Sequence, residues 1–215
     1  METKQILNRK STCQVGAIAG LFAIICYLGA SVLSMPDLVT RFMVFAFGPL
    51  LVVGFIGIYS FFQGIKHGPE LQISFIFGIL AGATLTLMII IQIANGMWHQ
   101  EAMDVAKSDD AILMYKAALI GADRVQLGMD ITMDIFITIS IILLGICLLR
   151  NSLTSKIFGI SGILLASLLL ILNMITFPNP PGSAGLYDAG PIFGLWLLAF
   201  FVWLTILSFQ KKRST

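Results

Sequence analysis

Charged residues are scarce in this 215-residue sequence: Asp, Glu, Lys and Arg make up 11% of it, against about 25% in soluble domains. Hydrophobic residues make up 58%, and the mean hydropathy is +0.95. The net charge of +2 is small, and its basic residues are spread along the chain rather than gathered in the patch that nucleic-acid binding requires. The composition excludes an ordinary soluble domain and a nucleic-acid partner, and it predicts an integral membrane protein.

Histidine and cysteine are also rare. The two histidines, His67 and His99, fall at opposite membrane faces in the predicted topology, and no His-Glu-x-x-His or Gly-x-Ser-x-Gly motif occurs. A histidine-rich intramembrane hydrolase site is therefore excluded, and we expect no bound metal and no cofactor. Cys13, Cys26 and Cys147 lie in or beside apolar segments without a paired spacing, so we interpret them as buried small side chains.

Long apolar runs fill most of the chain. A bilayer core of about 30 Å needs about 20 helical residues, and six runs reach that length. They predict an all-α fold in which residues 1–215 form one polytopic membrane domain. The first run follows a basic start, as in a secretory signal, but it is too long for one, so we expect it to be retained. The predicted spans cover about 14–34, 42–65, 71–98, 125–149, 157–177 and 191–209.

The longest polar connection covers residues 100–124. Within it the run 108–110, Ser-Asp-Asp, is typical of a helix start, because serine caps a helix and acidic residues suit its first turn. The following segment, 111–120, is too short to span a membrane. We therefore predict an amphipathic helix on the outer surface, separated from the fourth span by a break at Gly121. The connection 178–191 is rich in proline and glycine and predicts a stiff irregular loop.

The distribution of Lys and Arg predicts the topology, because cytoplasmic ends of spans carry an excess of basic residues. Nine of the 13 lie at one set of ends: Lys4, Arg9, Lys10, Lys66, Arg150, Lys156, Lys211, Lys212 and Arg213. The other set holds Arg41, Lys107, Lys116 and Arg124. Both termini are therefore predicted to be cytoplasmic, and the two longer connections to lie outside.

Two carboxylates lie inside the fourth predicted span. Gln126, Asp130 and Asp134 recur every four residues, which places them on one face of a helix. Because an aspartate in the middle of a span costs about 2.5 to 3.5 kcal/mol on insertion scales, this face should point to other helices or to a wet cavity. At about 1.5 Å per residue, Asp134 lies ~14 Å deep, close to the midplane of the core, so it is the more costly residue.

Other polar residues reach the same outer depth in this topology. They lie near the outer ends of the third and fifth spans and in the adjacent loop. We predict an outward-facing polar pocket lined by spans three, four and five and covered by the loop 178–191. Its candidate ligand-binding residues are Asp130, Asp134, Gln126, Gln92, Asn95, His99, Asn173, Tyr187 and Asp188.

Polar side chains inside a membrane can also serve structure alone. Measured interhelical hydrogen bonds average about 0.6 kcal/mol, so this role is common for amides and hydroxyls. The aspartates favour a functional role, because helix packing does not require charge, although Arg124 could pair with Asp130 structurally. His99 together with Asp130 and Asp134 suits zinc or manganese chemically. A lone histidine near an interface, however, is more often a satisfied end group than a ligand.

The last two-fifths of the chain carries several distinctive local motifs: Asp130-Ile-Thr-Met-Asp-Ile-Phe, Ser155-Lys-Ile-Phe-Gly-Ile-Ser-Gly162, Thr176-Phe-Pro-Asn-Pro-Pro-Gly182 and Asp188-Ala-Gly-Pro-Ile-Phe-Gly-Leu-Trp196. Over about residues 127–205 the sequence resembles a bacterial family of six-span membrane proteins catalogued as a domain of unknown function. The resemblance implies a bacterial cytoplasmic (inner) membrane location and no particular chemistry.

Three classes of function fit these patterns. The first is binding or transport of a small solute, a lipid head group, a cation or a proton through Asp130 and Asp134. The second is an intramembrane enzyme that acts on a lipid with the same carboxylates as acid and base, and the third is an accessory subunit of a membrane complex. Expected partners are membrane lipids and a second copy or a membrane-complex subunit, since six helices are few for an autonomous transporter.

Overall fold

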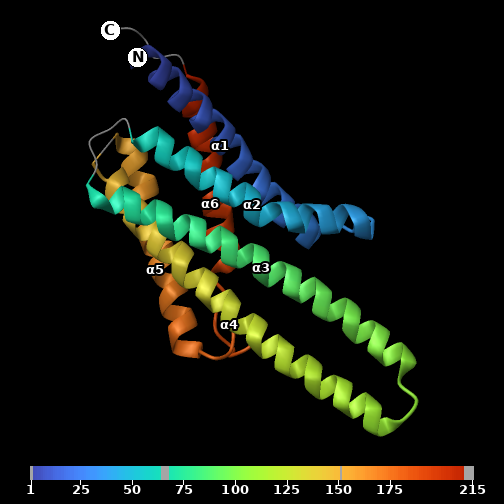
Figure 1. Cartoon of the computed structure of the whole chain (residues 1–215). Helices are drawn as coiled ribbons and strands as arrows, with labels where there is room; N and C mark the ends of the chain where they lie inside the picture. Colours follow the sequence, from blue (N-terminus) through green and yellow to red (C-terminus); the bar gives the residue numbers. More distant parts are fainter. Residues whose placement is uncertain (1, 64–67, 151, 211–215) are drawn as a thin grey trace.

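The computed structural model of the protein describes residues 2–63, 68–150 and 152–210, and all its regular elements in these ranges are helices (Figure 1). All six helices are long and apolar enough to cross a membrane. The predicted all-α fold with six spans is confirmed. The helices are α1 (Glu2–Val32), α2 (Asp37–Phe62), α3 (Pro69–Val105), α4 (Asp109–Leu148), α5 (Leu153–Thr176) and α6 (Gly190–Phe209).

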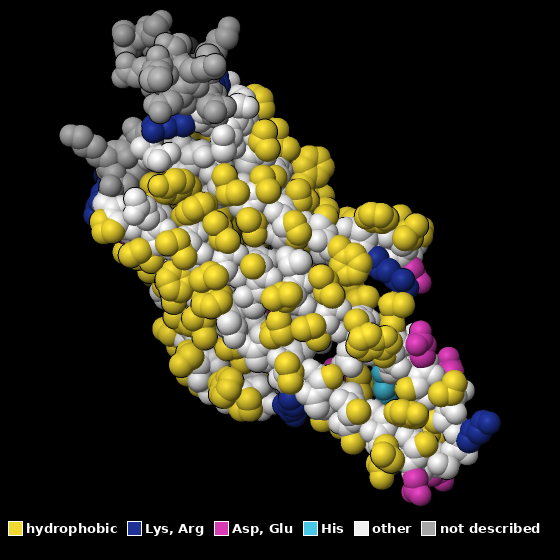
Figure 2. Space-filling view, viewed as in Figure 1, with side chains coloured by type: hydrophobic (Ala, Val, Ile, Leu, Met, Phe, Trp, Pro, Cys, Tyr) yellow, Lys and Arg dark blue, Asp and Glu magenta, His cyan; other side chains and the backbone are white. Residues whose placement is uncertain are grey.

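Large hydrophobic side chains cover the outside of the helix bundle (Figure 2). Phe22, Ile76 and Leu164, for example, are each more than half exposed. An apolar surface of this extent is foreign to a soluble monomer and suits contact with lipid. Together with the six apolar helices it indicates a multi-pass membrane protein.

The prediction of a separate outer connection over residues 100–124 is wrong. Helix α3 continues to Val105, and Ser108 caps α4, with its hydroxyl oxygen accepting a hydrogen bond from Ala111 N at 3.3 Å. The predicted helix start at 108–110 is therefore correct, but α4 then runs without a break through Gly121 into the fourth span. A single glycine costs a helix only about 1 kcal/mol, which packing against α3 can offset.

The other helix ends lie near the predicted bounds, with one exception. Helix α1 begins at Glu2 rather than near residue 14, because its polar first turns continue the helix of the apolar run. Figure 1 shows the start of α1 and the end of α6 at the same end of the bundle, as an even number of spans requires. Which side of the membrane they face stays a prediction.

Glycines mark the closest contacts between neighbouring helices. A Cβ added to Gly57 of α2 would lie 2.6 Å from the Cα of Gly16 in α1, and one added to Gly54 would lie 2.9 Å from the Cα of Gly20. Glycine lets the two backbones approach closely here, and such van der Waals packing is one of the forces that associate helices in lipid. Similar contacts join α2 to α3 at Gly48 and Gly82, and α4 to α5 at Gly145 and Gly159.

Helices α3 and α4 pack side by side and extend together beyond the rest of the bundle (Figure 1). In the bundle, the Ser74 hydroxyl donates to the Ser140 carbonyl oxygen at 2.8 Å, and the Ser140 hydroxyl donates to the Ser74 carbonyl oxygen at 2.7 Å. Further out, Asn95 Nδ2 donates to Asp123 Oδ1 at 3.3 Å. We call the projecting part, residues 95–123, the hairpin arm.

Candidate functional site

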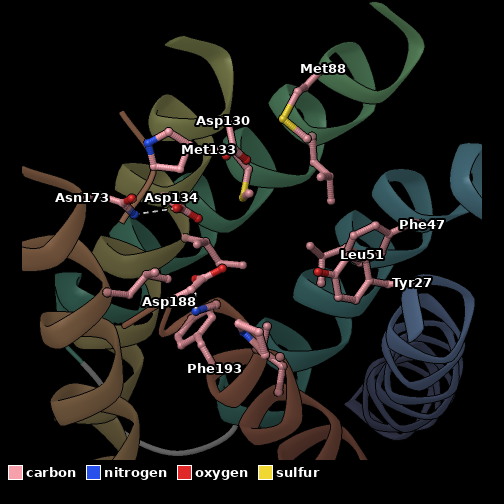
Figure 3. Close-up of a pocket in the computed structure, with 18 of the residues that line it drawn as sticks. Tyr27, Phe47, Leu51, Met88, Asp130, Met133, Asp134, Asn173, Asp188 and Phe193 are labelled. Carbon is pink, nitrogen blue, oxygen red and sulfur yellow. Dashed lines mark hydrogen bonds between the residues drawn. The ribbon is translucent and has the colours of Figure 1, made fainter. Parts of the chain in front are cut away.

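A cavity of about 320 Å³ lies inside the bundle, and all six helices and the α5–α6 loop contribute to its wall (Figure 3). We call it the central cavity. The sequence predicted a pocket whose wall is formed by fewer helices, those of spans three, four and five. The contribution of α1, α2 and α6 corrects that prediction: these helices close the side of the cavity that faces the α4 carboxylates.

Three carboxylates line the central cavity. Asp130 and Asp134 lie one turn apart on α4, and Asp188 comes from the loop, where its Oδ1 accepts a hydrogen bond from Gly190 N at 2.9 Å at the start of α6. The three groups are close enough to interact electrostatically. Among the described residues of the lining there is no Lys, Arg or His. The wall therefore has acidic groups without a basic partner.

The Asp134 carboxylate is held by helix α5. Asn173 Nδ2 donates to Asp134 Oδ2 at 2.6 Å, and Figure 3 shows this bond on the cavity wall. Asn173 is itself 5% exposed. One turn further along α4, the Thr138 hydroxyl donates to the Asp134 carbonyl oxygen at 2.6 Å. The amide fixes one carboxylate oxygen and leaves the other available to a ligand.

The rest of the cavity wall is apolar and rich in aromatic rings and thioethers. Tyr27 and Phe47 stack with their ring centroids 5.1 Å apart, and Phe193 lies on the α6 side. Met88 and Met133 face the same space (Figure 3). Aromatic faces attract cations and sulfur is polarisable, so this wall suits an apolar or cationic group.

The structure brings together four of the nine predicted site residues, namely Asp130, Asp134, Asn173 and Asp188. The others lie elsewhere. Gln126 and Asn95 are outside the cavity lining, and Asn95 instead donates to Asp123 at the base of the hairpin arm. Tyr187 is next to Asp188 in sequence, but its side chain is 59% exposed on the surface.

Gln92 and His99 line a separate groove between α2 and α3. The Arg124 guanidinium donates to Asn179 Oδ1 of the α5–α6 loop at 3.4 Å. Among the described residues its side chain forms no ion pair with Asp130, and the one ion pair found there joins Glu70 and Arg150 at the other end of the bundle. The structural pairing considered for Asp130 is therefore wrong.

Tyr27 and Phe47 are cavity residues that the sequence analysis missed. Both lie in ordinary apolar spans, and hydropathy cannot tell an aromatic residue that faces a cavity from one that faces lipid. The hydroxyl of Tyr27 was the one available signal, since a phenol buried in a span usually has a polar neighbour. Tyr27 interacts electrostatically with all three cavity carboxylates.

No three His, Cys, Asp or Glu side chains in the described part of the chain are close enough together to hold a metal ion. The cavity geometry is thus one of separate carboxylates around an apolar space. No family model, curated protein or solved structure matches the chain, so the resemblance to a bacterial six-span family stays a prediction.

Proposed function

We propose that the protein binds a small organic cation with an apolar body in the central cavity, as a step in carrying it across the membrane. The observation that carries the proposal is the cavity lining itself, with Asp130, Asp134 and Asp188 and no basic residue among the described residues. The apolar walls would contact the apolar body of the ligand, as the carboxylates would contact its charge.

The charge of the cavity favours a cationic ligand. Carboxylates removed from water lose hydration energy, and in a membrane interior they are stabilised by pairing with a cation or by remaining wet. Asn173 supplies one hydrogen bond to Asp134 and no charge. A bound ammonium group would supply that charge, and it would be attracted to three acidic groups at once.

The size and the walls of the cavity favour an organic ligand over a bare metal ion. A volume of about 320 Å³ is at the lower end of the range of roughly 300 to 1,000 Å³ found for small-molecule sites. Tyr27, Phe47 and Phe193 offer ring surfaces that an inorganic ion would leave unused, whereas a substituted ammonium contacts them through its carbon atoms.

The proposal is tested by titrating the purified protein with three ligands of one ring size: phenyltrimethylammonium, benzyl alcohol and benzenesulfonate. We expect binding of the cation alone by calorimetry. Asp134→Asn and Asp188→Asn should each weaken it at least about tenfold, because a charge contact near 4 Å at an effective dielectric of 20 exceeds ~1.4 kcal/mol.

Asp104→Asn is the matched control, since Asp104 is exposed on the hairpin arm and should leave cation binding unchanged. Uptake of labelled phenyltrimethylammonium into proteoliposomes then tests the transport step. Equal binding of all three ligands, or equal losses in Asp104→Asn and Asp134→Asn, would contradict the proposal and favour an accessory role for the polar helix face.

A further inference from the structure

A second hollow, an open groove of about 680 Å³, lies between the first turns of α2 and the outer part of α3. Two helix faces form it. On α2 the lining residues follow the spacing i, i+3, i+4, i+7, and on α3 they continue at the same helical spacing over 89–100. Figure 2 shows the hollow between the two projecting ends of the molecule, with charged side chains beside it. We call it the α2–α3 groove.

The α2–α3 groove is distinct from the central cavity. None of its lining residues is among those that line the cavity. Ligand binding in the groove can therefore be tested independently of the proposed cation site.

The groove crosses the expected outer edge of the hydrocarbon core. Ile89 follows Pro69, the start of α3, by 20 residues, or about 30 Å, which is the thickness of the core. On α2, Arg41 precedes Phe62 by 21 residues, or about 32 Å. Trp98 is 69% exposed nearby, as expected of an aromatic residue at a membrane interface.

The chemistry of the groove changes with this depth. Its apolar part, Val44, Ile89 and Ile93, lies on the core side, and its polar part includes Asp37, Arg41 and His99 on the outer side. An apolar floor below and charged groups above match an acyl chain joined to a polar head group, whereas a soluble ligand would use only the polar part.

Two opposite charges in the groove have no partner within the described part of the chain. Asp37 and Arg41 lie one helical turn apart on the same face of α2 but form no ion pair or side-chain hydrogen bond there. An arginine guanidinium binds phosphate oxygens with two parallel hydrogen bonds, and a carboxylate binds an ammonium group. Gln92 and Gln100 add amide donors and acceptors.

We propose that the α2–α3 groove binds a phospholipid with an amine-bearing head group, its phosphate on Arg41 and its ammonium near Asp37. The acyl chain lies along Val44, Ile89 and Ile93. The spacing of the two charges fits one zwitterionic head group, because phosphate and ammonium are separated by two carbon atoms in ethanolamine lipids.

The test is a lipid titration of detergent-purified, delipidated protein by native mass spectrometry, with phosphatidylethanolamine and phosphatidylglycerol of identical chains. We expect wild type to prefer phosphatidylethanolamine. Arg41→Gln should weaken binding of both lipids at least about tenfold, because it removes a charge-assisted bidentate contact. Asp37→Asn should weaken binding of phosphatidylethanolamine alone and so abolish the preference.

Two control variants make these results specific. Lys116→Gln removes an exposed basic residue of the hairpin arm and should bind both lipids as wild type does. Arg41→Lys keeps the charge without the planar fork, so it should weaken binding less than Arg41→Gln. Equal losses in Arg41→Gln and Lys116→Gln, or a preference of wild type for phosphatidylglycerol, would overturn the proposal.

The source of the phosphate is tested with phosphoethanolamine, which has the head group without acyl chains. A 100-fold excess of phosphoethanolamine should not displace the phospholipid, because phosphoethanolamine has no acyl chain to contact the apolar part of the groove. Displacement would assign the groove to a soluble phosphate ester and overturn the lipid proposal. Arg41 is exposed, so Arg41→Gln should unfold without lipid within about 2 °C of wild type.

Discussion

At Asp134 a carboxylate lies near the middle of a membrane-spanning helix with Asn173 as its side-chain donor, at 2.6 Å. The amide is buried and comes from a neighbouring helix, so the bond links α4 to α5 across the cavity wall. The hydrogen bond fixes the orientation of the carboxylate, but the neutral amide does not balance its charge. We interpret Asp134 as a residue whose charge serves ligand binding at some cost in stability.

Asp134→Asn is therefore expected to stabilise the protein by roughly 1 kcal/mol, a fraction of the ~2.5 to 3.5 kcal/mol insertion cost of aspartate. The new amide oxygen can still accept from Asn173. Asn173→Ala should instead destabilise the protein by about 1 to 3 kcal/mol, because it leaves the carboxylate without its donor. Thermal unfolding in detergent measures both changes.

Asp104→Asn on the exposed hairpin arm should leave stability within about 0.5 kcal/mol of wild type. If Asp134→Asn instead lowers stability as much as Asn173→Ala does, the aspartate is part of the helix packing, and the case for a charged site weakens.

The cost of charge in a membrane made part of the site predictable. Asp130 and Asp134 could be placed toward the interior because lipid offers a carboxylate no partner, and Asp188 because its loop lies at the same end of the bundle. The sequence could not show that Gln92 and His99 lie outside the cavity. The depth of a residue along a span does not say in which direction around the bundle axis its side chain points. Figure 1 shows that the start of α2 and the outer part of α3 spread apart, and Gln92 and His99 line the groove between them.

Among the elements, the α1–α2 pair shows how the helices of this bundle associate. Gly16 of α1 faces Gly57 of α2 backbone to backbone, and one turn away the Phe201 ring of α6 packs against both Gly20 and Gly54. The spacing of Gly16 and Gly20 is visible in the sequence and is typical of close helix contacts. It identifies a packing face, but the choice of partner helix depends on the whole bundle.

Gly57→Ala is expected to destabilise the protein by about 1 to 3 kcal/mol, because its Cβ would lie 2.6 Å from the Gly16 Cα and only a movement of the helices can relieve that contact. Gly121→Ala is the matched control. Gly121 has open space around a would-be Cβ inside the continuous α4, so alanine there should add up to about 1 kcal/mol of helix stability.

Thermal unfolding of the two glycine variants side by side is the measurement. A loss of stability in Gly121→Ala would mean that residue 121 needs the break that sequence patterns predict. The length of α4 illustrates why such breaks are hard to predict: Ser108 and the acidic first turn identify where the helix begins, whereas its continuation past Gly121 depends on the packing of α3 beside it.

For the whole molecule, the helices differ greatly in length. Helix α6 has 20 residues and α5 has 24, close to what a core of ~30 Å requires at about 1.5 Å per residue. Helices α3 and α4 have 37 and 40 residues, or about 55 and 60 Å. The hairpin arm therefore extends well beyond the hydrocarbon core on one side of the membrane.

If both termini are cytoplasmic, as the distribution of basic residues predicts, the hairpin arm is outside. In a variant without native cysteines, Lys107→Cys at the tip of the arm should react with a membrane-impermeant maleimide in intact cells. Lys156→Cys, exposed at the opposite end of the bundle, should react only after permeabilisation. The reverse pattern would invert the topology and place the central cavity toward the cytoplasm.

The reciprocal Ser74–Ser140 bonds join α3 to α4 at a point far from the tip of the hairpin arm. Asp130 precedes Ser140 by 10 residues and Asp109 precedes it by 31, so Asp130 lies ~15 Å and the tip of the arm ~46 Å from this link along α4. A rigid tilt about it would displace the tip roughly three times as far as Asp130. If such a tilt accompanies ligand binding in the cavity, a label at the tip of the arm would report it more sensitively than a label beside Asp130.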